Sequence, residues 1–416
     1  MPSKAALQAA ANTANKGAEP LPDDVKKSLL VKAAEKVARI SEVSTIFDPR
    51  YEALLSRFEE NEVKLGKLLG TGGFCSVFEV NKLDLTSVKA DRIEAEHKGE
   101  MEEHHARSFM SMACIRNGDA RYAVKRLSTD SSASEELYGK AVADLATEAR
   151  FLTVIQHPNI IKVRGFALGN FCSDNFFLMM DRLYDTLETG IRKWRGENQK
   201  YKGFLASFKG GKKKCEELFI DRINFAWDLS SALAHIHEKR VIYRDLKPEN
   251  VGFDIRGDVK IFDFGLAKEL KDVDKDGNYN LTGYCGSPIY MAPEVIQSKP
   301  YNEKADVHSY AIMLWEMMAL KQPYDSTKMN LNLKSTLKLV VHKDYRPKPD
   351  KDWPQSLTKI IQNAWHPNAN KRLPFYQIKK NLHDCVMDLG KESEDESFSL
   401  DKSTRSFKNF MEKSKK

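Results

Sequence analysis

The sequence predicts an α+β protein with two lobes, a small strand-rich lobe followed by a larger helical one. Two β-like runs flank a glycine cluster between Val63 and Val80, and a third run, RYAVKRL, follows at residues 121–127. Apolar residues then recur at helical spacing over residues 142–155 and, more strongly, over residues 220–236. A chain of 416 residues with 41% hydrophobic and 30% charged residues is typical of a globular protein with two or three lobes.

Two stretches interrupt or precede the strand-rich region. Residues 1–60 are rich in Ala, Lys and Glu with weak apolar spacing, which predicts an N-terminal extension that is partly helical or disordered. Residues 82–119 are highly charged and separate two predicted strands, although such connections usually span only a few residues. We therefore expect residues 82–119 to be an insertion on a surface loop.

The helical region carries a second unusual segment and ends in a polar tail. Residues 192–216 are basic and contain glycines, and they precede the long amphipathic pattern. Residues 291–320 and 356–388 predict further helices. Residues 389–416 alternate acidic, Ser and Lys residues without apolar periodicity, which predicts a disordered tail.

The net charge of +7, from 66 Lys+Arg against 59 Asp+Glu, is concentrated in one place. Residues 192–216 hold nine basic and two acidic residues, so the rest of the chain is neutral. We expect a solvated loop; the alternative is a docking or localisation patch for an acidic partner, an import factor or an anionic surface. The chain lacks the basic clusters with stacking aromatics of a dedicated nucleic-acid binder, and that function would have to depend on this segment alone.

Cysteine usage and hydropathy bear on the compartment. The six cysteines are scattered without a C-x-x-C pair, which indicates reduced thiols. No stretch approaches the ~20 apolar residues of a membrane helix, and the N-terminus lacks the apolar region of a secretory signal. These features predict a protein of the cytosol or nucleus.

A glycine cluster, GTGGFCSV at residues 70–77, lies between the first two predicted strands. Glycines let backbone amides approach phosphate oxygens because no Cβ is in the way, but the cluster alone also fits a simple hairpin. Lys125 on the third predicted strand and Glu148 on the following helix add context, although each alone is typical of a surface charge. A lysine that grips phosphates needs a carboxylate to hold its ammonium group.

Three further motifs follow in order. Residues 243–250 read YRDLKPEN, residues 263–265 read DFG, and residues 291–294 read MAPE. With the glycine cluster, Lys125 and Glu148, they stand in the order and spacing of the eukaryotic protein kinases, and the chain resembles that family.

The resemblance runs from about Val63 to Val386. It implies a bilobal protein kinase fold with a small β-rich N-lobe and a larger α-helical C-lobe. It also implies ATP and Mg²⁺ as cofactors and transfer of the γ-phosphoryl group to protein hydroxyls. The expected boundaries are a kinase domain at 61–388, an N-lobe at about 61–180 and a C-lobe at about 184–388.

The resemblance assigns roles residue by residue. Asp245 would accept or orient the proton of the substrate hydroxyl, and Lys247 would steady the transferred phosphoryl group. Lys125, paired with Glu148, would grip the α- and β-phosphates. The metal ligands would be oxygen atoms, which suit Mg²⁺, from Asn250 and Asp263. The other nucleotide-binding candidates are Gly70, Thr71, Gly72, Gly73, Phe74, Val77, Ala123, Met180, Asp181 and Leu183.

Two structural roles are also implied by the resemblance. Asp306 would be the buried acid that anchors the catalytic loop from a central helix, and Glu294 would pair with Arg372 in the lower lobe.

The expected substrate class follows from Lys247 and from GSPIY at residues 286–290, which resemble the corresponding motifs of serine/threonine kinases. The partners would then be proteins with Ser or Thr acceptors. The helix at 309–317, SYAIMLWEM, is similar to the tyrosine-kinase-like group. Arg244 beside Asp245 predicts regulation by an activation-loop phosphate. The candidate acceptors are Thr282, which we favour, Tyr279 and Tyr284.

Three departures from the family keep a pseudokinase as the alternative. Cys75 replaces the usual third glycine, and Tyr243 replaces a histidine; we expect Tyr243 to pack against the DFG phenylalanine. Gly252 stands where a larger apolar residue usually forms the floor under adenine, and we expect Val251 or Phe253 to compensate.

One motif is a false lead. Residues 272–283, DVDKDGNYNLTG, begin like an EF-hand loop but end in Gly283, where a bidentate Glu is needed. We therefore expect no calcium site there.

Overall fold

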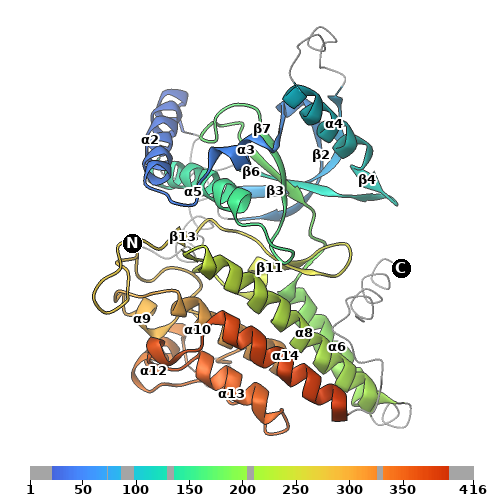
Figure 1. Cartoon of the computed structure of the whole chain (residues 1–416), viewed down its shortest axis with the longest axis vertical. Helices are drawn as coiled ribbons and strands as arrows, with labels where there is room; N and C mark the ends of the chain where they lie inside the picture. Colours follow the sequence, from blue (N-terminus) through green and yellow to red (C-terminus); the bar gives the residue numbers. More distant parts are fainter. Residues whose placement is uncertain are drawn as a thin grey trace.

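The computed structural model confirms the α+β, bilobal class (Figure 1). A strand-rich lobe lies above a helical lobe, and within the described residues the chain passes from the first lobe to the second after strand β8. The structure describes residues 21–72, 74–85, 98–128, 135–203, 210–325 and 331–392, with side chains except at 98–101 and 390–392.

The N-lobe is built on a six-stranded sheet in the order β1-β7-β8-β6-β3-β2. Antiparallel pairing of β3 with β6 and of β6 with β8 makes β6 the strand between them, and β6 carries Lys125. The strands, in sheet order, are Ser56–Phe58, Val163–Ala167, Phe177–Asp181, Tyr122–Leu127, Cys75–Leu83 and Val63–Thr71.

Helix α5 (Glu135–Val154) packs on this sheet and in turn supports the N-terminal extension. Helix α2 (Asp23–Glu42) lies along α5, and α3 (Pro49–Ala53) follows (Figure 1). The expected helical content of residues 1–60 is confirmed for this part, while residues 1–20 lie outside the described residues.

Strand β1 corrects the boundary that we set at residue 61. It pairs in parallel with β7, so the extension is part of the N-lobe sheet. Its approach requires a glycine at 165, because a Cβ there would lie 2.6 Å from the carbonyl oxygen of Ser56. A three-residue strand with a partner about a hundred residues away leaves no periodic signal in the sequence.

The insertion at residues 82–119 is more ordered than the expected surface loop. Strand β3 continues to Leu83, and helix α4 (Lys98–Met112) and the short strands β4 (Ile115–Arg116) and β5 (Asp119–Ala120) follow. The Ser111 hydroxyl donates to the carbonyl of Leu83 at 2.7 Å, which fastens α4 to β3. Residues 86–97 of the insertion lie outside the described residues.

The C-lobe is a helical layer around one buried helix, α10. Every residue of α10 from Ala305 to Met318 is buried, so α10 forms the centre of the lobe. The helices of the lobe are α6 (Leu187–Tyr201), α8 (Gly211–Glu238), α9 (Pro293–Ile296), α10 (Lys304–Ala319), α12 (Leu333–His342), α13 (Gln355–Ala364) and α14 (Phe375–Glu392). Its short strands are β9 (Asp185–Thr186), β10 (Val241–Ile242), β11 (Val251–Phe253), β12 (Val259–Ile261) and β13 (Lys268–Glu269). Single 3₁₀ turns lie at Glu60–Glu62, Pro248–Asn250 and Ala369–Lys371.

The expectation of a solvated loop at residues 192–216 is wrong for most of that segment. Its first ten residues complete α6 and its last six begin α8, while residues 204–209 lie outside the described residues. Lys193 pairs with Asp185 at 2.7 Å, and Arg195 donates to the Leu320 carbonyl at 2.5 Å. These two basic side chains therefore fix α6 to its neighbours, which reduces the charge available to an external partner.

The tail begins later than predicted, because α14 continues through Glu392. The rest of the predicted disordered tail, residues 393–416, lies outside the described residues.

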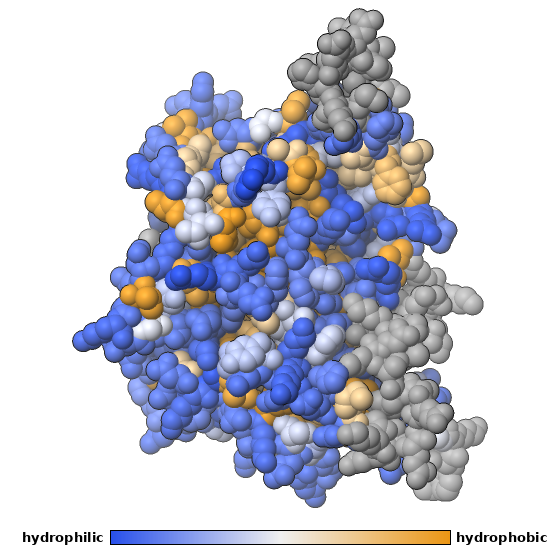
Figure 2. Space-filling model, in the orientation of Figure 1, coloured by the Kyte–Doolittle hydropathy of each residue, from blue (hydrophilic) through white to orange (hydrophobic). Residues whose placement is uncertain are grey.

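The surface in Figure 2 is mainly hydrophilic, with hydrophobic residues in small patches. Within the described ranges, no helix combines the length and the apolar character needed to cross a membrane.

A buried aromatic cluster predicts where the C-lobe is most sensitive. Phe225 of α8 stacks on Trp194 of α6 at 5.6 Å between ring centroids and meets Phe253 edge-on at 5.5 Å. Phe225→Ala should lower the free energy of unfolding by about 3–5 kcal/mol, because the cavity cannot close between three helical and strand elements. Urea unfolding measures this loss. Tyr376→Ala, at a side chain that is 65% exposed, is the control and should change stability by less than about 0.5 kcal/mol; equal effects of the two variants would contradict the assignment.

Candidate active site

Lys125 of β6 lies between two carboxylates. Its Nζ is 2.6 Å from Oε2 of Glu148 on α5 and 3.2 Å from Oδ1 of Asp263. Burial alone would lower the pKa of Lys125, but the carboxylates of Asp263 and Glu148 outweigh it and raise that pKa above its usual value. The two carboxylates thus favour the charged ammonium form, and the expected pairing of Lys125 with Glu148 is confirmed in geometry.

The catalytic loop is held by Asp306 of α10. One carboxylate oxygen accepts from the amide of Tyr243 at 2.8 Å and contacts Nε2 of His237 at 2.9 Å, and the other accepts from the amide of Arg244 at 2.8 Å. Arg244 has φ 71° and Asp263 has φ 62°, the left-handed region that non-glycine residues rarely adopt. The anchoring role expected of Asp306 fits these contacts, and the bonds compensate for burying its charge.

Three side chains converge on the carboxylate of Asp245. Asn250 donates from Nδ2 to Oδ2 of Asp245 at 2.9 Å, and Nζ of Lys247 is 3.3 Å from the same oxygen. Ser287 donates to Oδ1 of Asp245 at 2.9 Å and accepts from Lys247 at 2.9 Å. The structure therefore brings together the predicted Asp245, Lys247 and Asn250, and it adds Ser287, which we had used only to judge substrate class.

Tyr243 replaces histidine without disturbing the DFG segment. Its ring is completely buried and meets the ring of Phe264 edge-on at 5.1 Å, and its hydroxyl donates to the carbonyl of Phe262. The expected packing against the DFG phenylalanine is confirmed.

The donors expected for Mg²⁺ fit a hard cation. Asn250 uses Nδ2 for both of its side-chain bonds to Asp245, so its carbonyl oxygen is the atom left to face a metal. Asp263 supplies a carboxylate, and its neighbour Phe262 donates a backbone bond to Asn250 at 3.1 Å, which holds the two segments together. In the part of the chain that the structure describes, no group of three His, Cys, Asp or Glu side chains could hold a metal. A nucleotide-bound cation would thus need phosphate oxygens as further ligands.

The expected nucleotide-binding residues lie on adjacent strands. Val77 of β3 is the cross-strand partner of Lys125, and Ala123 is the partner of Met180. Of the predicted glycine-loop residues, Gly70 and Thr71 are the last two residues of β2, and Gly72 and Phe74 lie between β2 and β3, with Gly73 outside the described residues.

The side chain of Asp181 is engaged by Arg164 of the neighbouring strand β7. Arg164 donates to both of its carboxylate oxygens, at 2.7 and 2.9 Å. Only the backbone of Asp181 therefore remains available for nucleotide binding, the role that the sequence predicted.

Gly252 is compensated differently from our expectation. A Cβ at Gly252 would lie 2.7 Å from Cδ1 of Leu183, so the Leu183 side chain fills the space that a larger residue would take. Val251 and Phe253 are completely buried and, because side chains alternate along a strand, they face away from that space. The compensation predicted for Val251 or Phe253 is therefore wrong.

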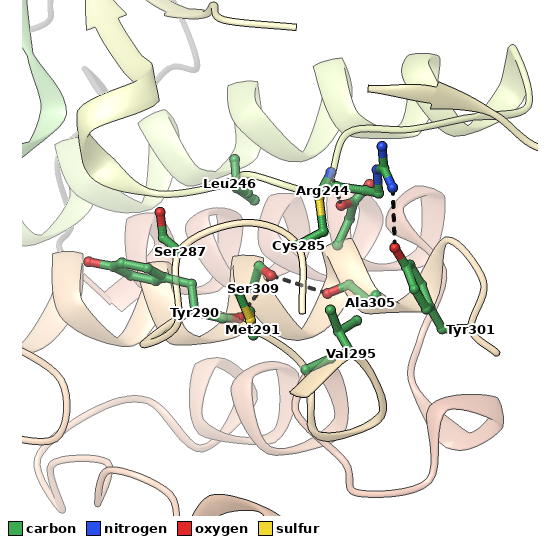
Figure 3. A pocket seen from close by; sticks show the side chains of 12 residues that line it. Arg244, Leu246, Cys285, Ser287, Tyr290, Met291, Val295, Tyr301, Ala305 and Ser309 are labelled. Carbon is green, nitrogen blue, oxygen red and sulfur yellow. Dashed lines mark hydrogen bonds between the residues drawn. The ribbon is translucent and has the colours of Figure 1, made fainter. Parts of the chain in front are cut away.

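Figure 3 shows a small cavity between the activation segment and α10. Its volume of about 10 Å³ is no more than one water molecule needs, so it marks packing rather than a ligand site. At its edge the Arg244 guanidinium donates to the Tyr301 hydroxyl at 3.5 Å and to the Leu266 carbonyl at 2.7 Å. The Tyr301 hydroxyl in turn donates to the carbonyl of Thr282 at 2.9 Å, which joins the catalytic and activation loops.

Two further expectations bear on the lower lobe and the false calcium motif. Arg372 holds Glu294 through two bonds of 2.6 and 2.9 Å, as the sequence predicted.

The side chain of Asp274 accepts from the amides of Asp276 and Asn278, so the EF-hand-like segment is a closed turn.

Comparisons with known proteins agree with this geometry. Residues 108–383 match the family model described as "Protein kinase domain", and the chain belongs to this family. The match starts within the insertion and leaves the glycine loop outside it.

Among relatives, the chain is 28% identical over 258 residues to the serine/threonine-protein kinase STY17 of Arabidopsis thaliana, covering 62% of this chain and 40% of that protein. It is 35% identical over 192 residues to cAMP-dependent protein kinase type 3 of Saccharomyces cerevisiae, covering 46% and 41%. It is 27% identical over 325 residues to the serine/threonine-protein kinase Nek10 of Homo sapiens, covering 77% and 22%. Each alignment spans less than half of the relative's own length.

The buried Glu316 predicts a pH effect on stability. It accepts from the hydroxyl of Tyr290 at 2.7 Å, and burial raises its pKa to about 7. The folded state therefore binds the proton more tightly than the unfolded chain, and this contribution is full below the usual glutamate pKa and lost as the pH rises through 7.

Glu316→Gln should remove this dependence. Between pH 4.5 and 8 the unfolding free energy of the variant should gain about 3 kcal/mol relative to the natural protein. Urea unfolding at several pH values measures the difference, with the exposed Glu238→Gln as control. Parallel pH profiles of Glu316→Gln and the natural protein would show that Glu316 is not the titrating group.

Proposed function

We propose that this chain is an active serine/threonine protein kinase that transfers the γ-phosphoryl group of ATP to Ser or Thr hydroxyls of proteins. The observation that carries the proposal is the convergence of Lys247, Asn250 and Ser287 on the carboxylate of Asp245. The names of the relatives support the Ser/Thr class. None of the six cysteines, all within the described residues, forms a disulfide, which supports the cytosol or nucleus as the compartment.

Asp245 acts on the incoming hydroxyl. Bonds from Asn250 and Ser287 fix its two carboxylate oxygens in one orientation, so that it accepts the hydroxyl proton as the new O–P bond forms. Lys247 lies 3.3 Å from that carboxylate and neutralises charge on the transferred phosphoryl group.

Lys125 positions the nucleotide. Held by Glu148 and Asp263, its ammonium group binds the α- and β-phosphates and keeps ADP in line as leaving group. Asn250 and Asp263 would hold Mg²⁺, which when bound neutralises phosphate charge.

Substitution at Asp245 tests the activity directly. Asp245→Asn keeps the shape but removes the proton acceptor, so phosphate incorporation from radiolabelled ATP into a protein substrate should fall by about 10²–10⁴-fold. Asp352→Asn makes the same chemical change at an exposed position and should retain the activity of the natural protein. Equal background incorporation by the natural protein and Asp245→Asn would instead favour the pseudokinase alternative, a binding scaffold without turnover.

We also propose that phosphorylation of Thr282 regulates the activity. Its side chain is exposed, and its carbonyl is already joined to Arg244 through Tyr301. A phosphate at Thr282 is a strong partner for a guanidinium group. Phosphosite mapping after incubation with Mg·ATP should find Thr282, and Thr282→Ala should lower activity several-fold more than Tyr279→Phe or Tyr284→Phe. A phosphate at either tyrosine, with Thr282 unmodified, would replace this assignment.

A further inference from the structure

Residues 23–58, which we name the N-terminal arm, contact two parts of the site that are far apart in sequence. One is α5, which carries Glu148, and the other is β13, which begins five residues after Asp263. Figure 1 shows α2 beside α5 and the arm descending from there toward β13.

The arm packs along α5 through apolar contacts. Ala33 and Val37 of α2 are buried, and a Cβ at Gly139 of α5 would meet Leu29 at 3.6 Å, so α2 and α5 are in close contact. Because these side chains are apolar, their burial favours the position of α5 that covers them.

The contacts continue to the turn of α5 next to Glu148. Phe47 meets Phe151 edge-on at 5.0 Å between ring centroids, and Arg150 pairs with Glu52 at 3.3 Å. Arg150 and Phe151 lie two and three residues after Glu148, so the arm restrains the part of α5 that presents the carboxylate to Lys125.

The arm also binds β13 through one carboxylate. The Ser44 hydroxyl donates to Oε2 of Glu269 at 2.8 Å, and Thr45 donates to Oε1 from its amide at 2.9 Å and from its hydroxyl at 2.5 Å. Lys271 closes the contact by donating to the Val43 carbonyl and pairing with Glu269 at 3.2 Å. Burial tends to raise the pKa of Glu269, but the bonds from Thr45 and Ser44 outweigh it and lower that pKa, which favours the ionised acceptor.

Glu269 is close in structure to the catalytic loop. In the antiparallel pair of β13 and β10 it is opposite Val241, two residues before Tyr243. A bond made by the arm at Glu269 therefore restrains the strand pair that lies between the DFG segment, which leads into β13, and the catalytic loop, which follows β10.

We propose that the N-terminal arm is an internal positioning element for phosphoryl transfer. By binding α5 and Glu269 together, it sets the distance between Glu148 and the segment that carries Asp263, the two partners of Lys125. Ser44, Thr45 and Glu269 are positioning residues, since they touch neither substrate nor nucleotide. This inference rests on the proposed kinase activity.

A negative charge at residue 45 tests the proposal. Thr45→Glu would place a second carboxylate against Glu269, and the repulsion should release the arm. We expect kcat/KM for ATP to fall by about tenfold, the effect of losing one hydrogen bond to a charged group. In the full chain, amide exchange of residues 135–154 and 263–271 should become faster, which is a readout independent of turnover.

Matched variants distinguish the loss of the arm's contacts from a general loss of stability. Thr45→Ser keeps the hydroxyl and should behave as the natural protein, and Gln355→Glu adds the same charge at an exposed C-lobe position and should change neither readout. If Thr45→Glu unfolds, the Ser44→Ala and Thr45→Val double variant removes both hydroxyls without adding charge and should show a smaller loss in the same direction.

The outcomes distinguish this inference from the proposed function. An active natural protein whose Thr45→Glu and double variants keep its rates and exchange would overturn the positioning role alone. A natural protein without phosphate transfer would overturn the proposed function and this inference with it.

Discussion

The buried carboxylate of Asp306 is the interaction on which the site depends. It lies on α10, whose neighbours exclude water, and burying such a charge is costly unless donors surround it. The amides of Tyr243 and Arg244 and the ring of His237 supply those donors. The buried helix α10 therefore determines the backbone path of the catalytic loop, and Asp245 follows in an orientation that packing alone would not define.

At the site, the two lobes are joined by charge as well as by the buried apolar cluster that runs through both. Lys125 belongs to the N-lobe sheet and Asp263 to the C-lobe, and Glu148 completes the set from α5. A cation shared by two carboxylates holds its place only while both are within reach, so the position of α5 controls the charge balance around Lys125. The residues that pack against α5 therefore affect the phosphate-binding lysine through the position of this helix.

Much of the site could be predicted from the sequence, because several short motifs stand in a fixed order along the chain. Their order and spacing identify the individual site residues. Lys125, Glu148, Asp245 and Asn250 were found in this way, and so was the contact of Tyr243 with the DFG segment. Membership of the tyrosine-kinase-like group stays a prediction.

The features that the sequence did not reveal depend on partners distant in the chain. Strand β1 has only three residues and is recognised as a strand only by its pairing with β7. The Leu183 side chain reaches the space at Gly252 from the connection between β8 and β9. The basic run at 192–216 has a composition typical of loops, yet most of its described residues are helical, and Lys193 and Arg195 bind a carboxylate and a carbonyl of the C-lobe. In each case tertiary contacts override local composition.

Strand β1 has a practical consequence for the sheet edge. It covers β7, and the Leu168 amide donates to the Phe58 carbonyl at 2.7 Å just beyond the pair. A shortened protein that began at residue 61 would leave the amides and carbonyls of β7 without this partner. An uncovered strand edge recruits strands from other molecules, so the short β1 protects the N-lobe from aggregation as well as completing it.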